Sequence, residues 1–284
     1  MNPTLHYKMK QSASALPKTM TQFDAPQPTP EVPSAVSEPL VSPDPPAKPA
    51  LIAPLWHTLL IMALILGNSF LGSSKVGAVH GSGSRILLYG GTFVTQFVLI
   101  LLIWFGIRRR GVRMRDLIGG RWKTVEAFLL DAALAFGFWI TSLLLLFGIR
   151  VALGTIDLHN MQKSVDDTVR ILGPMAPHTY LEAGLFVFLS VSAGLFEEII
   201  FRGYLQRQFG ALGRNAIIGI VASGILFGLA HGYQGPRMMI VIGVYGIFFG
   251  ILAHLRKSLR PGMMAHAFQD SIAGIGLFKL VTRH

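Results

Sequence analysis

The stretch Phe196-Glu197-Glu198-Ile199-Ile200-Phe201-Arg202-Gly203-Tyr204-Leu205 places two carboxylates and a guanidinium inside an apolar segment that begins near Leu181. In hydrocarbon an ionisable side chain costs roughly 2.5 to 3.5 kcal/mol on insertion scales, so such residues face a bundle interior or a watery cavity and mark function. The stretch therefore predicts a membrane-spanning helix whose charges meet polar partners on other helices.

The composition is that of a polytopic membrane protein, because 51% of the 284 residues are hydrophobic and only 14% are charged. The net charge of +11 does not indicate nucleic-acid binding, since most basic residues lie in short loops beside apolar runs, where they set membrane orientation. The chain has no cysteine, which excludes a disulfide, a thiol nucleophile and a thiolate metal site.

Seven apolar stretches follow residue 50 and predict an all-α, polytopic transmembrane helix bundle. Each has roughly the 20 helical residues that cross a hydrocarbon core of about 30 Å. The sequence is compatible with six to eight spans, the eighth being an extra or re-entrant segment. The expected limits are 51–72, 86–107, 125–149, 183–206, 215–233, 237–255 and 261–281.

Three regions are expected along the chain. Residues 1–50 hold 11 of the 16 prolines, which predicts a disordered, Pro-rich cytoplasmic tail that acts as a tether or, alternatively, as a Pro-rich docking site. Residues 51–180 should form N-terminal transmembrane helices and loops. Residues 181–284 should form a C-terminal transmembrane core around the charged stretch.

Loop charge predicts the orientation of the bundle. The loop after the second span is the most basic in the chain and is expected in the cytoplasm. Segment 149–180 carries three aspartates and is expected outside, so the N-terminus is cytoplasmic and the C-terminus external. If the protein is bacterial, the plasma (inner) membrane is its expected location. The basic residues of the cytoplasmic loop are Arg108, Arg109, Arg110, Arg113, Arg115, Arg121 and Lys123.

Helical spacing assigns different roles to the two adjacent glutamates. Residues four apart share one face of a helix, whereas neighbours are turned by about 100°. Arg202 is therefore placed to pair with Glu198, while Glu197 points elsewhere and is free to act as a base toward water. The alternative is that all three charges only hold helices together.

Two more apolar stretches carry polar residues: His231 in the fifth, and His266 with Asp270, four residues apart, in the seventh. If they converge on Glu197, they offer two imidazoles able to bind water or donate to an oxyanion, and an acceptor that fixes a histidine tautomer. A lone histidine near a helix end is otherwise an interfacial residue. Two histidines and a glutamate would also suit zinc, although the chain contains no His-Glu-x-x-His.

Three motifs in order resemble those of the CAAX-protease and bacteriocin-processing (CPBP/ABI) family, whose eukaryotic relative is type II CAAX prenyl endopeptidase. They are Glu197-Glu198-x-x-x-Arg202, Phe227-x-x-x-His231 and His266-x-x-x-Asp270. The resemblance covers about residues 181–280. It implies an intramembrane endopeptidase of the glutamate type, in which Glu197 activates water, His231 helps to hold that water, His266 stabilises the oxyanion and Asp270 orients His266. Glu198 and Arg202 correspond to the supporting ion pair, and Phe227 to the packing position of its motif.

The resemblance implies a membrane-associated peptide or protein substrate and no cofactor, with zinc as the less favoured alternative. Two other function classes stay open. One is a non-catalytic membrane scaffold or immunity protein, which would need the Glu198–Arg202 pair but not both histidines. The other is a proton-coupled transporter, for which buried glutamate and histidine are typical.

The depth of His231 decides whether the polar residues can converge. Asn215 to His231 corresponds to about 24 Å of helix, whereas Glu197 and His266 are expected nearer the cytoplasmic end. Convergence requires either a tilted or protruding fifth helix, or a fourth span that continues to about Arg207 and so places Glu197 near mid-membrane.

Overall fold

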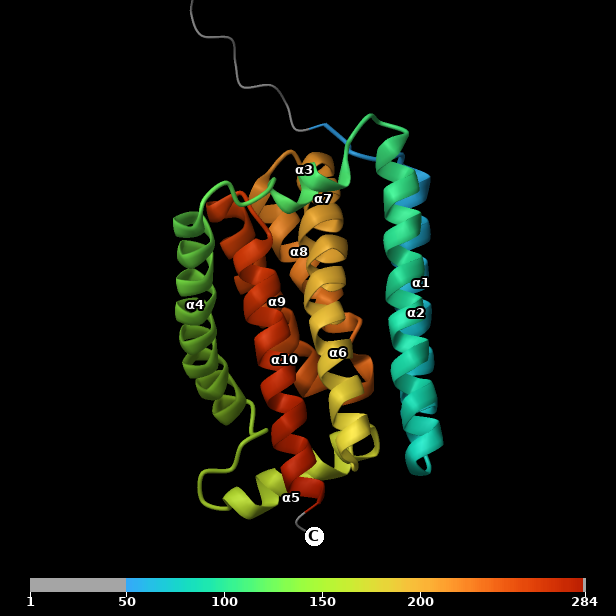
Figure 1. The fold of residues 1–284 in the computed structure, drawn as a ribbon, viewed down its shortest axis with the longest axis vertical. Helices are drawn as coiled ribbons and strands as arrows, with labels where there is room; N and C mark the ends of the chain where they lie inside the picture. Colours follow the sequence, from blue (N-terminus) through green and yellow to red (C-terminus); the bar gives the residue numbers. More distant parts are fainter. Residues whose placement is uncertain (1–49, 283–284) are drawn as a thin grey trace, which may run out of the picture. The chain divides into compact units, whose positions relative to one another are not determined.

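Helices and short connections make up the computed structural model, which describes residues 50–282 (Figure 1). No β-strand occurs in that part of the chain. The α-helices are α1 (Leu55–Gly77), α2 (Gly81–Arg108), α3 (Met114–Ile118), α4 (Val125–Ala152), α5 (Met161–Leu172), α6 (Tyr180–Glu197), α7 (Gln206–Leu212), α8 (Ala216–Leu229), α9 (Pro236–Arg256) and α10 (Arg260–Val281). Three further helical stretches are η1 (Gly173–Met175), η2 (Glu198–Leu205) and η3 (Gly232–Gln234). The predicted Pro-rich tail lies, except for Ala50, outside the described residues.

The all-helical membrane architecture is confirmed. Five helical segments are long and apolar enough to cross a membrane: Leu55–Gly72, Gly81–Arg108, Val125–Ala152, Tyr180–Leu212 and Pro236–Arg256. The fourth of these combines α6, η2 and α7 into one run of 33 residues. The helix α10 has 22 residues but carries His266, Gln269 and Asp270 in its middle, and it is not among the five.

The predicted full-length span over residues 215–233 is wrong. The helix α8 has 14 residues, which is about 21 Å and too short for a hydrocarbon core of about 30 Å. It ends because the chain turns through η3 and then through Gly235, whose φ of 87° suits glycine. Pro236 then opens α9, so α8 and α9 form a hairpin with its turn inside the bundle.

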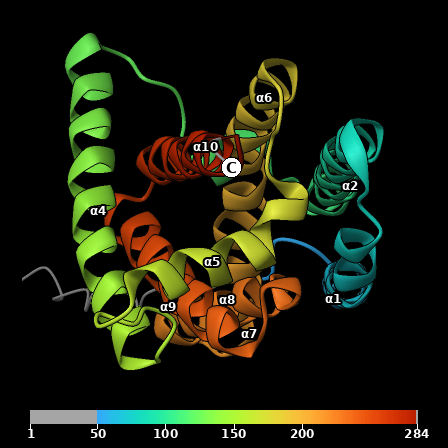
Figure 2. The same ribbon diagram turned by 90° about the horizontal axis from the view of Figure 1, so that it is seen from below.

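The C-terminal helices pack around one another, and the N-terminal helices flank them. The helix α10 lies beside α6, and α8 lies beside α9 (Figure 1). Seen from below, α4 lies on one side of this group and α1 with α2 on the other (Figure 2). The described residues all belong to one compact unit.

Glycines allow the hairpin of α8 and α9 to close tightly. A Cβ atom at Gly224 would lie 2.9 Å from the Ile247 backbone nitrogen, and one at Gly246 would lie 3.1 Å from the Gly224 Cα. Small residues allow this close approach of helices in lipid, where apolar side chains gain little by leaving the hydrocarbon.

Buried polar side chains join the N-terminal helices to the core at the end where α1 begins. His57 lies within 2.7 Å of the Tyr204 hydroxyl through Nδ1 and within 2.8 Å of the Leu102 carbonyl through Nε2. Gln208 donates to Thr58 Oγ1 and to the Ala53 carbonyl, at 2.6 and 3.0 Å. These bonds hold α1 against η2, which carries Arg202, and against α7.

Two ion-pair clusters attach α4 and α2. Asp131 in α4 is fully buried and lies 3.0 Å from both Arg256 and Arg260. Arg85 in α2 donates to Glu182 in α6 at 2.9 and 3.2 Å. A buried charge is tolerated only when it is paired, so these contacts fix the flanking helices at defined heights.

Candidate active site

A π-helical stretch, η2, lies at the centre of the site. It interrupts the run between α6 and α7, and each of its residues from Glu198 to Leu205 is buried. Such interruptions of an α-helix are frequent at functional sites. The ion pair expected from the sequence is present, since Arg202 donates to Glu198 at 2.9 Å. Arg202 also donates to the Gly246 carbonyl, and its guanidinium lies 4.3 Å from the centre of the Phe227 ring.

Glu198 also bonds His266, the ring whose orientation the family resemblance assigned to Asp270. His266 Nδ1 lies 3.0 Å from Glu198 Oε1, which as a carboxylate oxygen accepts the hydrogen bond. Asp270 Oδ2 lies 3.6 Å from His266 Nε2, which is too long for a hydrogen bond. Asp270 lies one turn along α10 from His266, whereas Glu198 approaches the ring from η2.

Glu197 has a different environment from its neighbour. Its side chain is 18% exposed, whereas the Glu198 side chain is 1% exposed, so Glu197 is the glutamate that water can reach. Its Oε1 accepts a hydrogen bond of 3.0 Å from Gln96 in α2. Its Oε2 lies 3.8 Å from His266 Nε2. One imidazole therefore faces both glutamates, with a different nitrogen toward each.

His231 lies just beyond the end of α8 and is held by that helix. Its Nδ1 is 2.8 Å from the Phe227 carbonyl, and a carbonyl can only accept, so Nδ1 carries the proton of the hydrogen bond. In the neutral ring, Nε2 is then an acceptor available to water.

The question of His231 depth is answered by the lengths of two helices. The helical run Tyr180–Leu212 continues beyond Arg207, which places Glu197 near its middle. The helix α8 begins at Ala216, at the end of the bundle where α7 finishes, and stops at Leu229, part of the way through the bundle. His231 and His266 both lie close to Phe227, with ring centres 4.8 and 5.9 Å from it. The helix α8, which is the fifth expected span, ends at the depth of the site because it is short, so it does not need to protrude from the bundle.

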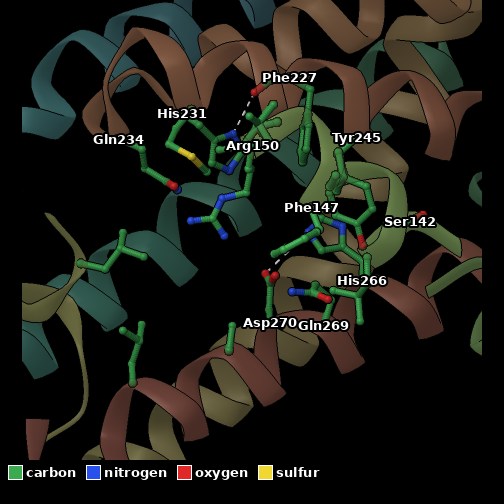
Figure 3. Close-up of a pocket in the computed structure, with 18 of the residues that line it drawn as sticks. Ser142, Phe147, Arg150, Phe227, His231, Gln234, Tyr245, His266, Gln269 and Asp270 are labelled. Carbon is green, nitrogen blue, oxygen red and sulfur yellow. Dashed lines mark hydrogen bonds and ion pairs between the residues drawn. The ribbon is translucent and has the colours of Figure 1, made fainter. Parts of the chain in front are cut away.

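A cavity of about 590 Å³ opens beside these residues and is enclosed by α4, α8, α9 and α10 with the α5 region (Figure 3). Its wall includes His231, His266, Asp270 and Phe227, together with many apolar side chains from α4 and α9. Cavities of roughly 300 to 1,000 Å³ typically hold small ligands. The volume and lining therefore suit an apolar ligand that presents a polar bond to the histidines.

Sequence reasoning missed three polar residues of this region, all on helices outside the motifs or between them. Gln96 of α2 bonds Glu197 directly, and Arg150 of α4 and Tyr245 of α9 line the cavity. Each is a polar residue inside a long apolar segment, the same signal that singled out Glu197. Applied to the second and sixth spans, that criterion would have found Gln96 and Tyr245, whereas Arg150 lies one residue beyond the expected third span, 125–149.

The positions of the histidines and carboxylates show whether three of them could bind one metal ion. Within residues 50–282, no three His, Asp or Glu side chains are grouped so that they could hold a metal ion. Glu197, Glu198 and Asp270 instead surround His266, at distances of 3.8, 3.0 and 3.6 Å.

These features define a helical integral membrane protein in which His231, His266 and Asp270 line a cavity and two glutamates lie beside His266. Residues 179–272 match the model of a family described as type II CAAX prenyl endopeptidase Rce1-like. This segment is similar to the Rce1-like family, which confirms the family resemblance recognised in the three motifs. The match covers about a third of the chain and includes all the predicted site residues from Glu197 to Asp270. Comparison with curated proteins found no match, and comparison with solved structures found none either.

Proposed function

We propose that this protein is an intramembrane endopeptidase in which Glu197 activates water and histidines stabilise the reaction. The family match supports a membrane-embedded protease of the CAAX type. The observation that carries the mechanism is the contrast between the two glutamates: Glu198 is sealed by Arg202 and His266, whereas Glu197 stays accessible beside the same imidazole. A general base needs this access to the proton that it removes.

Water activation uses Glu197 and His231. Glu197 takes a proton from a water molecule, and the resulting hydroxide attacks the carbonyl carbon of the peptide bond. His231 supports this step through Nε2, which accepts a hydrogen bond from the same water because Nδ1 is engaged with Phe227. The Gln96 amide holds the other oxygen of the Glu197 carboxylate, so the base is oriented before substrate binds.

His266 is assigned to the oxyanion side. In its imidazolium form Nδ1 donates to Glu198 while Nε2–H points toward the space between Glu197 and Asp270, where a carbonyl oxygen would develop negative charge. Collapse of the tetrahedral intermediate breaks the carbon–nitrogen bond, and Glu197 returns its proton to the leaving amine. Asp270 adds negative charge near Nε2 and so helps to keep this ring protonated.

The activity test uses the purified protein in detergent micelles with a library of membrane-proximal peptides, including prenylated and unprenylated forms of each. The family description makes peptides with a prenylated carboxy-terminal motif the first class to test. Glu197→Gln should reduce cleavage by about 10²- to 10⁴-fold, the usual contribution of a general base, and His231→Ala should also reduce it. Glu126→Gln makes the same change at an exposed site of α4 and should leave cleavage intact. Unchanged cleavage in both site variants would refute the mechanism.

Metal dependence is tested in the same assay. We propose a reaction without zinc, so cleavage should persist in the presence of a strong chelator. Loss of cleavage with the chelator, restored by added zinc, would assign the histidines to a metal instead.

A proton flux that depends on Glu197, with no cleavage of any peptide, would favour the transporter alternative. If neither peptide cleavage nor proton flux depended on Glu197, that result would support the alternative of a non-catalytic scaffold.

Membrane orientation has its own test, which the cysteine-free sequence simplifies. We propose that the α3 side of the bundle, with its arginines, is cytoplasmic and that α5 lies outside. A single cysteine at Asp166 in intact cells should react with a membrane-impermeant maleimide, whereas one at Arg121 should react only after the membrane is opened. The opposite labelling pattern would invert the orientation.

A further inference from the structure

Arg150 is a cation without a protein partner that faces the cavity. It lies in the last turn of α4, its side chain is half-buried, and Nε is sealed from water. It makes no side-chain hydrogen bond or ion pair with any of residues 50–282, whereas other buried arginines each bind a carboxylate: Arg202 and Arg85 bind a glutamate, and Arg260 binds Asp131. An unpaired buried charge is costly, so this position calls for an anion from outside the chain.

The location of Arg150 relates it to the reaction. It lines the same cavity as His231, His266 and Asp270, and Figure 3 shows its guanidinium group projecting into that cavity. A ligand that fills the cavity would therefore meet Arg150 and the histidines together. Bonds from the Thr155 and Ile156 backbone nitrogens to the Arg150 carbonyl, at 2.9 and 3.2 Å, hold the backbone that carries it.

The remaining wall indicates what kind of anion fits. Leu146, Phe147, Met238 and Ile242 contribute apolar surface, so the ligand should combine apolar groups with one negative charge. Guanidinium is a planar fork that binds a carboxylate through two parallel hydrogen bonds. A short apolar peptide segment with one carboxylate has this chemistry.

We propose that Arg150 is a specificity-determining residue that binds a carboxylate of the peptide substrate in this cavity. The inference rests on the proposed function in so far as it treats the ligand as substrate. The carboxylate can come from the end of the peptide chain or from an acidic side chain. In both cases Arg150 selects substrates in which the scissile bond and the carboxylate are close enough to occupy this cavity together.

Binding tests the subsite independently of cleavage. The probes are two tripeptides, N-acetyl-Leu-Phe-Leu with a free carboxyl end and the same peptide with a carboxamide end. A second pair, N-acetyl-Asp-Phe-Leu-amide and N-acetyl-Asn-Phe-Leu-amide, carries the charge on a side chain. Affinities are measured by calorimetry in maltoside micelles, which contain no phosphate that could occupy the site.

The wild-type protein should prefer the charged member of at least one pair by about 10- to 100-fold, the range expected for hydrogen bonds to a charged group. Preference within the first pair identifies a chain-terminal carboxylate, and preference within the second identifies an acidic side chain. Arg150→Gln should abolish the preference and Arg150→Lys should retain part of it. The control Arg237→Gln, at an exposed arginine near the turn that follows α4, should keep the full preference.

Three results separate the two proposals. An equal preference in wild type and Arg150→Gln, or none in wild type, overturns the carboxylate subsite, whatever the peptidase assay shows. Charge-selective binding that depends on Arg150, with no cleavage of any peptide, keeps the subsite and refutes the peptidase. When a peptide is cleaved, Arg150→Gln should raise KM for the charged form about 10-fold or more and leave kcat unchanged.

Discussion

The C-terminal helices and the N-terminal helices of this protein are buried to different degrees and use their polar residues differently. In the most apolar window of the run Tyr180–Leu212, 44% of residues are buried, compared with 11% in α4. The charges of the C-terminal region bind one another, as Glu198 does with Arg202 and His266. The N-terminal helices instead reach toward the site with single side chains, Gln96 from α2 and Arg150 from α4.

This difference suggests a division of labour. A closed network of charges resists change, because removal of one member leaves another charge buried without compensation. A half-exposed helix that contributes one side chain to a cavity wall can vary at little cost to folding. The C-terminal region would then hold the chemistry, while the flanking helices adjust the base and the choice of substrate.

The largest effect is expected from breaking the closed network. Arg202→Met should destabilise the protein by about 3 to 5 kcal/mol, because Glu198 would remain buried without its counter-ion. Thermal unfolding in micelles, followed by circular dichroism, measures the change as a lowered midpoint. Arg113→Met removes an exposed ion pair and serves as the control, with no measurable shift expected. Equal midpoints for the two variants would contradict the proposed contrast.

A smaller and more local effect is expected at the attachment of α4. Asp131→Asn removes the carboxylate that Arg256 and Arg260 share and should cost about 1 to 3 kcal/mol. Hydrogen exchange should accelerate in α4 while the run Tyr180–Leu212 keeps its protection. Acceleration throughout the bundle would mean that α4 is part of the core rather than a flanking helix. Glu126→Gln, at an exposed carboxylate of the same helix, is the matched control.

Substitution of Gln96 tests whether the flanking helix α2 affects the action of Glu197 as a general base. Gln96→Leu removes the hydrogen bond to Glu197 and should lower kcat about tenfold with KM unchanged, because the bond orients the carboxylate rather than the substrate. Gln96→Asn should not restore the rate, since its side chain is one methylene shorter. A rise in KM at constant kcat would instead place Gln96 in substrate binding.

The smallest effect is expected at Tyr245, whose hydroxyl is buried without a hydrogen-bond partner among the described residues. Tyr245→Phe should leave stability within about 1 kcal/mol of wild type or raise it, because no bond is lost. Tyr204→Phe is the comparison, since the Tyr204 hydroxyl bonds His57 and Thr58, and it should be destabilising. A fall in kcat for Tyr245→Phe at unchanged stability would reveal a hydroxyl that acts on the substrate.

Of the two contacts expected within single helices, the ion pair was predictable from the order of residues, whereas His266 and Asp270, with the same spacing, form no hydrogen bond. The spacing of four between Glu198 and Arg202 led to their ion pair, and the apolar runs led to the helical bundle. The same reasoning overestimated α8, because apolar composition continues beyond the point where Gly232 to Gly235 turn the chain. Hydropathy measures whether a segment can lie in lipid, but the end of a helix depends on backbone conformation.

Contacts between helices were decided only by the tertiary structure. The hydrogen bond from His266 to Glu198 rather than to Asp270, the approach of Gln96 to Glu197, and the entry of Arg150 into the cavity each depend on how far one helix is shifted and rotated against another. The sequence by itself determined which residues are too polar for lipid and therefore need partners. Which partners they find depends on the depth at which each helix packs, because periodicity along one helix carries no information about the height of its neighbour.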